Sequence, residues 1–362
     1  MKSEMHTFII AEAGVNHNGS LELALRLIDT AADAGADAVK FQTFRAAELA
    51  TQHAKKAEYQ QRTMTADEGQ FEMIRKLELS EEMHVAIVAH CKKRGIQFLS
   101  TPFDSASLHM LVERFGLQTI KLSSGDITNA PLLVDVARTA RHVILSTGMC
   151  GLMEVEAALG ALAFGFTAAE STAPGATAFG AAYASGAGQE ALRDCVTLLH
   201  CTTEYPAPLH EVNLRAMDTL ATAFGLSVGY SDHTEGINVA VAAVARGARM
   251  IEKHFTLDRI LPGPDHKASL EPDELAQMVT VIRQIETALG DGVKRPTASE
   301  WANRQIARKG IVAARAITKG EVFSADNLAV KRPASGRSPF EYWDLIGRKA
   351  GRSYSPDDPV DG

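Results

Sequence analysis

Two histidines in the second half of the sequence have the spacing and the neighbours expected of a metal site. His233 and His254 each follow a short apolar run, and the Ala- and Val-rich stretch Asn238–Arg246 between them has the length of a helix. The segment is therefore predicted to form a strand, a crossover helix and a parallel strand. Parallel neighbours lie about 4.8 Å apart, so both imidazoles could reach one Mn²⁺, Mg²⁺ or Zn²⁺ ion. The alternative is that each histidine only satisfies local hydrogen bonds.

Two lysines and a glutamate also follow apolar runs. Lys40 and Lys121 could bind a phosphate and a carboxylate, and a lysine in this position is otherwise expected to extend its charge to the surface. Glu12 could exchange a proton with a substrate or orient it, or could simply pair with a nearby lysine. Cys201 lies within an apolar run and is predicted to be a core residue rather than a nucleophile.

These residues need a scaffold that gathers many strand ends at one place. Up to about residue 288, β-rich runs alternate with amphipathic helical stretches such as Leu21–Ala34, Glu81–Arg94 and Ser105–Phe115. The predicted strands are Thr7–Ala11, Ala38–Gln42, Gln97–Ser100, Thr119–Leu122, Val143–Ser146, Val196–Cys201, Ser227–Gly229 and Met250–Lys253. Eight such units predict a (β/α)8 TIM barrel, with a doubly wound open sheet as the alternative. Polar residues end nearly every run, which indicates one shared site at the carboxyl ends of the strands.

Three segments interrupt this alternation. The long connection Arg45–Leu79, which contains the lysine-rich stretch Lys55–Gln60, is predicted to be a substrate lid. The Ala- and Gly-rich segment Thr167–Gly188 is predicted to be a flexible insertion. Val293–Ser299 has the composition of a linker.

The tail of the chain has a different pattern. Short β-like runs punctuated by proline and glycine, at Gly310–Ala313, Asn327–Val330 and Tyr342–Ile346, predict a small β-rich domain. The expected organisation is a catalytic barrel over residues 1–290, a linker over 291–305 and the small domain over 306–362.

Composition excludes several classes of protein. The 362 residues carry a net charge of −7, which does not favour a nucleic-acid partner. No apolar run approaches the roughly 20 residues of a membrane span, and the N-terminus lacks the apolar segment of a secretory signal. The four cysteines form no CxxC pair, so a reducing, cytoplasmic location is expected.

Motifs in order along the chain resemble the sialic acid (nonulosonate) synthase family. They are Ala11–Ser20, Val39–Thr43, Phe98–Asp104, Lys121–Asp126, Leu145–Met149, Leu199–Pro206, Gly229–Thr234, Glu252–Phe255 and Gly263–Asp265. The tail, with Lys319–Glu321 and Asn327–Gly336, resembles that family's antifreeze-like (SAF) domain. The resemblance covers nearly the whole chain.

This resemblance implies an enzyme, a transferase that forms a carbon–carbon bond between phosphoenolpyruvate and the open-chain form of an N-acetylated hexosamine. It implies release of phosphate and a nine-carbon 2-keto acid as product. A divalent metal, Mn²⁺ or Mg²⁺, would be held by His233 and His254 and would polarise the sugar aldehyde.

The resemblance also implies roles for individual residues. The residues expected to bind phosphoenolpyruvate are Lys40, Thr101, Lys121, Ser124 and Ser146. Those expected to face the sugar or a metal-bound water are Gln42, Tyr205 and Asp265, and Glu12 would be the acid/base or orienting carboxylate. Arg332 would reach the sugar's acetamido group from the tail of a second subunit, which implies a domain-swapped homodimer.

The acceptor sugar is the point on which branches of the family differ. Cys201–Pro208 together with Asp265–Pro272 resembles the branch that makes N,N'-diacetyllegionaminate from 2,4-diacetamido-2,4,6-trideoxymannose. Bacterial N-acetylneuraminate synthases, which use N-acetylmannosamine, share the lysine-rich stretch and remain the alternative. Ala334 stands where the family more often has glycine, which could shift the loop carrying Arg332.

Two further readings compete with this one. A sibling enzyme that uses a phosphorylated aldose would need a cluster of arginines at the strand ends, which the sequence does not show. A non-enzymatic carbohydrate-binding protein would leave Lys40, Lys121 and both histidines without a purpose.

Overall fold

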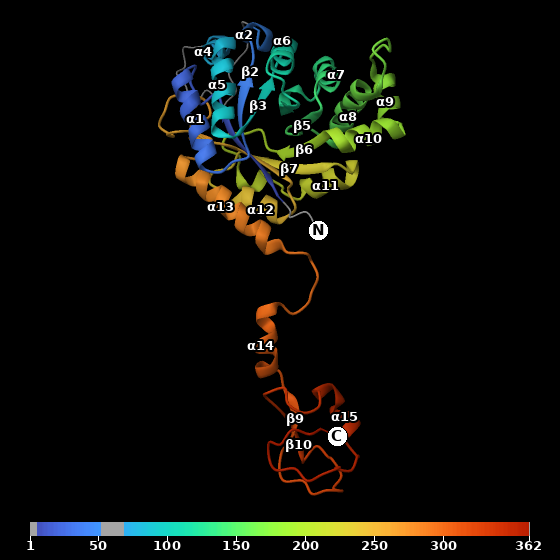
Figure 1. Ribbon diagram of the computed structural model, residues 1–362. Helices are drawn as coiled ribbons and strands as arrows, with labels where there is room; N and C mark the ends of the chain where they lie inside the picture. The colour runs from blue at the N-terminus through green and yellow to red at the C-terminus, as the bar shows by residue number, and fades with distance from the viewer. Residues whose placement is uncertain (1–5, 52–68, 362) are drawn as a thin grey trace. The chain divides into compact units, whose positions relative to one another are not determined.

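The computed structural model describes residues 6–51 and 69–361 and divides into two compact units, Met1–Gly290 and Asp291–Gly362 (Figure 1). The lysine-rich stretch Lys55–Gln60 lies outside the described residues. Each unit is taken by itself below.

The first unit is built on eight parallel strands in the order β3-β2-β1-β8-β7-β6-β5-β4. Their bounds are β1 Phe8–Gly14, β2 Ala38–Thr43, β3 Gln97–Pro102, β4 Thr119–Leu122, β5 His142–Ser146, β6 Val196–Cys201, β7 Ser227–Asp232 and β8 Met250–His254. The two end strands of this order, β3 and β4, also lie against each other, so the sheet curls into a near-barrel. The predicted TIM-barrel class is confirmed, and every strand begins within one residue of its predicted start.

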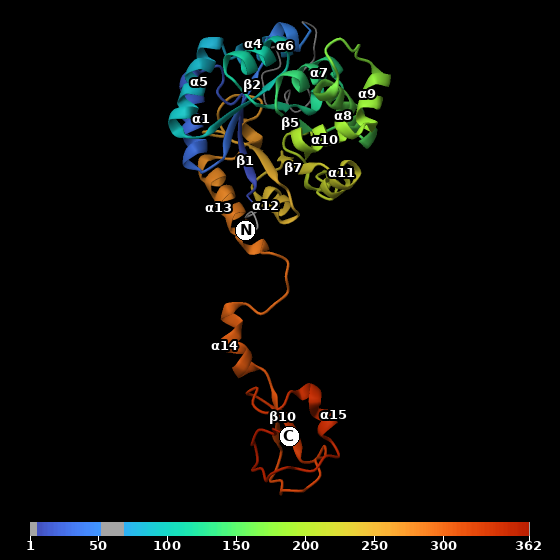
Figure 2. The ribbon, with the colours of Figure 1, turned by 45° about the vertical axis from the view of Figure 1, so that its right-hand side comes forward.

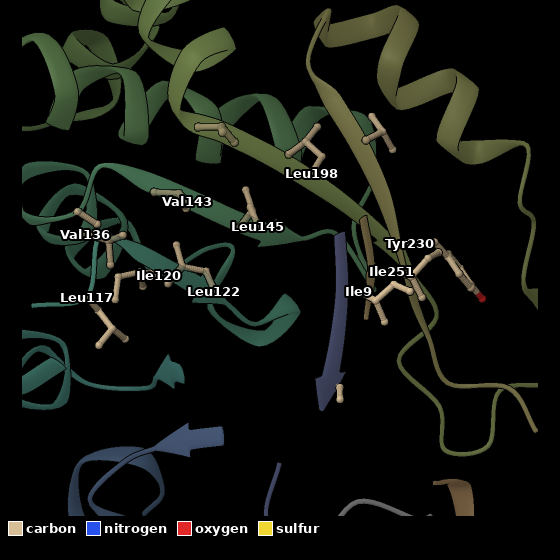
Figure 3. Packing of buried hydrophobic residues seen from close by; sticks show 14 of the residues in the cluster. Ile9, Leu117, Ile120, Leu122, Val136, Val143, Leu145, Leu198, Tyr230 and Ile251 are labelled. Carbon is tan, nitrogen blue, oxygen red and sulfur yellow. The ribbon is translucent and has the colours of Figure 1, made fainter. Parts of the chain in front are cut away.

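Strand alternation divides the buried residues into two sets. Side chains on one face, such as Ile120 and Val143, pack against the helices in the main core (Figure 3). Side chains on the other face form a separate cluster inside the barrel, made of Ile10, Ala38, Leu99, Ile144 and Leu199. We call this cluster the barrel plug. Because the side-chain period of a strand is two, the next inward residue on each strand lies one layer above the barrel plug, toward the carboxyl ends of the strands.

Helices that follow the strands cover the barrel. They are α1 Leu21–Asp33, α5 Glu81–Arg94, α6 Ser105–His109, α7 Ala130–Thr139, α8 Leu152–Thr167, α11 Ala216–Phe224, α12 Asn238–Ala245 and α13 Pro272–Leu289. Ser20, Ser80 and Asp104 cap α1, α5 and α6 by accepting backbone N–H groups. Two of the predicted helices, Leu21–Ala34 and Glu81–Arg94, are confirmed, and the third continues past α6 as a π-helical turn over Met110–Arg114. None of the helices in the described residues has the length and hydrophobicity needed to cross a bilayer.

The prediction of a flexible insertion at Thr167–Gly188 is wrong over most of its length. Residues Ala176–Ala184 form helix α9 and Gly186–Cys195 form α10, and both lie side by side with α8 (Figure 2). Phe179 of α9 packs edge-to-face on Phe164 of α8, with ring centroids 5.3 Å apart. Alanine is the best helix former, so an Ala-rich segment becomes ordered once α8 offers an apolar surface to cover.

The long connection after β2 contains two described helices, α2 Ala46–Leu49 and α4 Gln70–Lys76. Phe44, Met73 and Leu77 form a small apolar cluster with Val15 of the β1 loop. The lid function of this connection stays a prediction.

The second unit has a core of its own around Ile311, Phe323, Leu328 and Tyr354. Strands β9 Gly310–Ala313 and β10 Leu328–Lys331 confirm two of the three predicted β-like runs, and the structure pairs them antiparallel. The third prediction is wrong, because Tyr342–Leu345 forms the short helix α15 after a 3-10 turn over Pro339–Glu341. Within the predicted linker, a capping box between Thr297 and Glu300 starts helix α14, Ala298–Ala307.

Candidate active site

A cavity of about 500 Å³ opens at the carboxyl ends of the barrel strands. Each of the eight strands, or the loop that follows it, contributes to its wall. Eleven of the twelve predicted site residues line it: Glu12, Lys40, Gln42, Thr101, Lys121, Ser124, Ser146, Tyr205, His233, His254 and Asp265. The twelfth, Arg332, is an exposed residue of the second unit.

The strand period explains why these residues converge. Glu12, Lys40, Thr101 and Ser146 each lie two positions after a member of the barrel plug, and Cys201 lies two after Leu199. All five side chains therefore point inward, one layer above the plug. Gly14 keeps the end of β1 bare at φ +52°, because a Cβ there would lie 3.3 Å from a Glu12 oxygen.

Two lysines and two glutamates form the charged floor of the cavity. Lys40 Nζ lies 2.8 Å from Glu12 Oε2 and 3.6 Å from Glu252 Oε2, and it donates a hydrogen bond to Thr101 Oγ1 at 3.0 Å. Lys121 Nζ lies 3.4 Å from Glu252 Oε1. All four charged side chains are at most 5% exposed, so little solvent screens them.

The two carboxyl groups titrate in opposite directions. Burial raises the pKa of Glu12 to about 7, against the pull of Lys40. Burial would also raise the pKa of Glu252, but Lys121 and Lys40 outweigh it and hold that pKa at about 2. At neutral pH Glu252 is therefore a fixed anion, whereas Glu12 can carry a proton.

The two histidines face each other above this floor, with ring centroids 5.6 Å apart. His233 Nδ1 donates to the carbonyl oxygen of Thr202 at 2.6 Å, and Tyr205 lies against the His233 ring at 4.2 Å between centroids. Burial lowers the pKa of His233 to about 4 and that of His254 well below its usual value. Both imidazoles are therefore neutral near pH 7, the state in which they ligate metals.

The donor set suits a divalent cation that keeps open positions. His254 Nδ1 is buried and has no hydrogen-bond partner among the described residues, and the Asp265 carboxylate lies 4.0 Å from it. The described part of the chain contains no cluster of three or more His, Cys, Asp or Glu side chains arranged to hold a metal. Two imidazoles with a nearby carboxylate thus fit an ion whose other ligands come from substrate and water.

Hydroxyl groups at the ends of β4, β5 and β6 complete the wall. Ser124 Oγ accepts a hydrogen bond from the Gly148 N–H at 2.9 Å and lies 3.2 Å from Cys201 Sγ. Ser146 Oγ and Thr203 Oγ1 are buried with no hydrogen-bond partner among the described residues. Buried hydroxyls are rarely left unpaired in proteins, so these two are available to a ligand.

Several residues of the cavity were not predicted. Glu252 and Ser231 lie within two of the family motifs, but the sequence assigned neither of them a role; Ser231 Oγ donates to Glu252 Oε1 at 2.8 Å. Both lie on inward positions of β7 and β8, two before His233 and His254, so strand alternation was the signal that could have found them. Phe44, Met73 and Leu77 form an apolar wall of the cavity, and strand alternation could not have indicated them because they lie outside the strands.

Comparisons with known proteins agree over nearly the whole chain. The NeuB family model matches residues 27–294 and the SAF domain model matches residues 308–362. The N,N'-diacetyllegionaminic acid synthase of Campylobacter jejuni is 51% identical over 354 residues, which are 98% of each chain. The enzyme of the same name from Legionella pneumophila is 44% identical, over 98% of this chain and 93% of its own.

A solved structure shows the same fold. The N-acetylneuraminic acid (sialic acid) synthetase of Leptospira borgpetersenii has 35% identity and a TM-score of 0.65, and the match covers 82% of this chain and 90% of that one. With a family model over most of the chain and relatives of this identity at full length, the chain belongs to the NeuB family and carries a C-terminal SAF domain.

Proposed function

We propose that this protein is a nonulosonic (sialic) acid synthase that condenses phosphoenolpyruvate with an N-acetylated mannosamine-type sugar and releases phosphate. The observation that carries the proposal is the single cavity in which two buried lysines, two buried glutamates and a neutral histidine pair meet. Its charges and hydroxyls match an enol phosphate that bears a carboxylate, and the full-length similarity to named synthases supports the same reaction.

The floor of the cavity binds phosphoenolpyruvate. Lys40 and Lys121 supply positive charge, and Thr101, Ser124 and Ser146 supply hydroxyl groups. Charge-assisted hydrogen bonds in a cavity shielded from water are stronger than those between neutral groups. Ionised Glu252 keeps both lysines directed inward, because it lies within 3.6 Å of each Nζ.

His233 and His254 would hold a divalent metal, Mn²⁺ or Mg²⁺, with Asp265 beside it. Such an ion supplies Lewis-acid polarisation of a sugar aldehyde. The ring of Tyr205 packs on His233 and meets His254 edge-on at 5.5 Å, so it fixes the orientation of both imidazoles and borders the place of the sugar. Gln42 lines the same region.

Glu12 is the proton-transfer residue of this proposal. Its carboxyl group can be either protonated or ionised near pH 7, which suits a general acid or base. It lies beside Lys40 at the end of β1, in register with His254, and therefore between the proposed phosphoenolpyruvate and metal sites.

The acceptor we propose is 2,4-diacetamido-2,4,6-trideoxymannose, so that the product is N,N'-diacetyllegionaminate. Relatives named for this product are 51% and 44% identical, whereas a pseudaminic acid synthase of Campylobacter jejuni is 33% identical. The apolar wall of Phe44, Met73 and Leu77 suits a sugar with a methyl group at C6 and an extra acetyl group. N-acetylmannosamine is the alternative acceptor.

The assembly belongs to the proposal as well. Arg332 is exposed in the second unit, and so are the aromatic side chains Phe340 and Trp343, at 94% and 78%. We propose that the SAF domain of one subunit supplies Arg332 to the barrel of its partner in a domain-swapped homodimer. A cytoplasmic location accords with four cysteines that are all free thiols.

The test is phosphate release from phosphoenolpyruvate with each acceptor in turn. Release that needs an amino sugar, stops with a chelator and returns with Mn²⁺ or Mg²⁺ would support the proposal. Phosphate release that is independent of every amino sugar in the panel would contradict it.

A further inference from the structure

A second pair of charged residues lies next to the two histidines but outside the cavity. Asp232 Oδ2 and Lys253 Nζ are 2.9 Å apart, and both side chains are 0% exposed. Each residue directly precedes one of the histidines, His233 or His254. Because strand residues alternate, the histidines point into the barrel while this pair points out of it, toward the helices.

The pair ties down the backbone on both sides of His233. Asp232 Oδ1 accepts hydrogen bonds from the backbone N–H of Thr234 at 2.9 Å and from Thr234 Oγ1 at 2.8 Å. Lys253 Nζ donates to the backbone carbonyl of Thr234 at 2.5 Å. Both neighbours of His233 are thus bonded to Lys253, which is the residue before His254.

Strand pairing alone does not give His233 this support. The ladder between β7 and β8 ends with Asp232 opposite Lys253, and His233 is the first residue beyond it. His254, in contrast, is still paired, opposite Glu12 of β1. His233 itself is bonded through Nδ1 to the Thr202 carbonyl and through its backbone carbonyl to the Ala207 N–H. The ion pair adds the connection to β8, so it ties the backbone around His233 to the strand that carries His254.

A buried ion pair of this kind contributes little to the stability of the fold. Removing two charges from water costs about as much as their attraction returns, and apolar replacements of buried ion pairs are often just as stable. A buried pair is better explained by a geometry that it enforces. We propose that Asp232 and Lys253 are positioning residues that set the separation of His233 and His254, and with it the affinity for the metal; this inference rests on the proposed metal site.

The test compares two ligands on one double variant, Asp232→Asn/Lys253→Met, which removes both charges and keeps the side-chain sizes. Free Mn²⁺ is measured by electron paramagnetic resonance and phosphoenolpyruvate binding by calorimetry with chelator present. The expected result is Mn²⁺ affinity at least tenfold weaker, with phosphoenolpyruvate affinity within twofold of wild type, because Lys40 and Lys121 lie on β2 and β4.

A matched control pair lies at the other end of the barrel, where Arg283 Nη2 and Asp37 Oδ2 are 2.8 Å apart. Asp37→Asn/Arg283→Met should leave Mn²⁺ affinity unchanged. A folded Asp232→Asn/Lys253→Met variant that binds Mn²⁺ like wild type would overturn the inference. If that variant does not fold, the single variant Asp232→Asn, which removes one charge of the pair with Lys253, takes its place: weaker Mn²⁺ binding supports the inference and unchanged binding overturns it.

Failure of the proposed metal site gives a different result. In that case wild-type protein and a His233→Ala variant would bind Mn²⁺ equally, and the positioning inference would fall with the site. If His233→Ala loses Mn²⁺ but the double variant does not, only the positioning inference is wrong.

Discussion

At the scale of single residues, different sets of neighbours give two carboxyl groups different tasks. Glu12 and Glu252 are both buried beside Lys40, but Glu252 also has Lys121 and the hydroxyl of Ser231. The extra partners keep Glu252 ionised, whereas burial raises the pKa of Glu12 to about 7. Glu252 can therefore act as a permanent anion that holds the lysines in place, and Glu12 can act as a carboxyl group that exchanges a proton.

Replacement of Lys121 tests the floor of the cavity. A hydrogen bond to a charged group contributes roughly 1.5–3 kcal/mol, so Lys121→Met should weaken phosphoenolpyruvate binding about ten- to a hundredfold. Calorimetric titration measures this directly, and Lys92→Met, on the exposed face of α5, is the control. Unchanged affinity in Lys121→Met would remove this lysine from the site.

At the scale of elements, strand alternation made most of the site predictable. Lys40, Thr101 and Ser146 end runs of β-rich residues, and a barrel has to bring such ends together. The two histidines follow from the same rule. The prediction overlooked the residues two positions earlier, Ser231 and Glu252, because it weighted strand ends and not the whole inward face.

Other elements could not be predicted from local sequence. The run at Tyr342–Ile346 has strong β propensity, yet the 3-10 turn begun at Pro339 leads it into a helix whose Leu345 fills the small core. Helix α9 has a helix-favouring composition, but the surface of α8 that it covers lies on another element. The apolar surfaces that Leu345 and α9 cover are formed by other parts of the chain.

The loop after β5 offers a test at this scale. A Cβ at Gly148 would overlap Thr203 Oγ1 and come within 2.9 Å of Ser124 Oγ, so Gly148→Ala should displace both side chains. Phosphoenolpyruvate binding should fall about tenfold or more through lost hydroxyl contacts. Gly151→Ala in the same loop is the control, because the nearest atom would be 3.9 Å away. Equal affinities for the two variants would contradict this account.

At the scale of the whole molecule, the two units keep separate cores. The main core, the barrel plug and the apolar cavity wall all lie before Gly290, and the small core lies after it. A chain ending at Gly290 should therefore fold and bind phosphoenolpyruvate but lose most condensation activity, because the proposed Arg332 contact is missing.

Mixing Arg332→Ala subunits with His233→Ala subunits should restore some activity, because a mixed dimer can combine an intact metal site with an intact arginine at one of its two sites. No recovery after verified subunit exchange would rule out an arginine acting between subunits.

The folded protein should lose stability in acid, because it contains buried histidines that are neutral. Burial lowers the pKa of His17 to about 4, against about 6.5 in an unfolded chain. The unfolded chain then binds more protons, so the stability from His17 is complete above pH 6.5 and is lost as pH falls toward 4. The unfolding free energies of wild type and His17→Gln should converge over that range, by about 1.4 kcal/mol per pH unit, in urea titrations. A pH-independent difference would show that His17 does not titrate this way.

The most direct test of the central claim is a competition between acceptors. The protein is incubated with phosphoenolpyruvate, Mn²⁺ and equal amounts of 2,4-diacetamido-2,4,6-trideoxymannose and N-acetylmannosamine. The nine-carbon acids that form are then separated, identified and quantified by mass spectrometry. We predict that N,N'-diacetyllegionaminate exceeds N-acetylneuraminate at least tenfold and that His233→Ala forms neither. Formation of N-acetylneuraminate alone, or of no nine-carbon acid by the wild-type protein, would contradict the account.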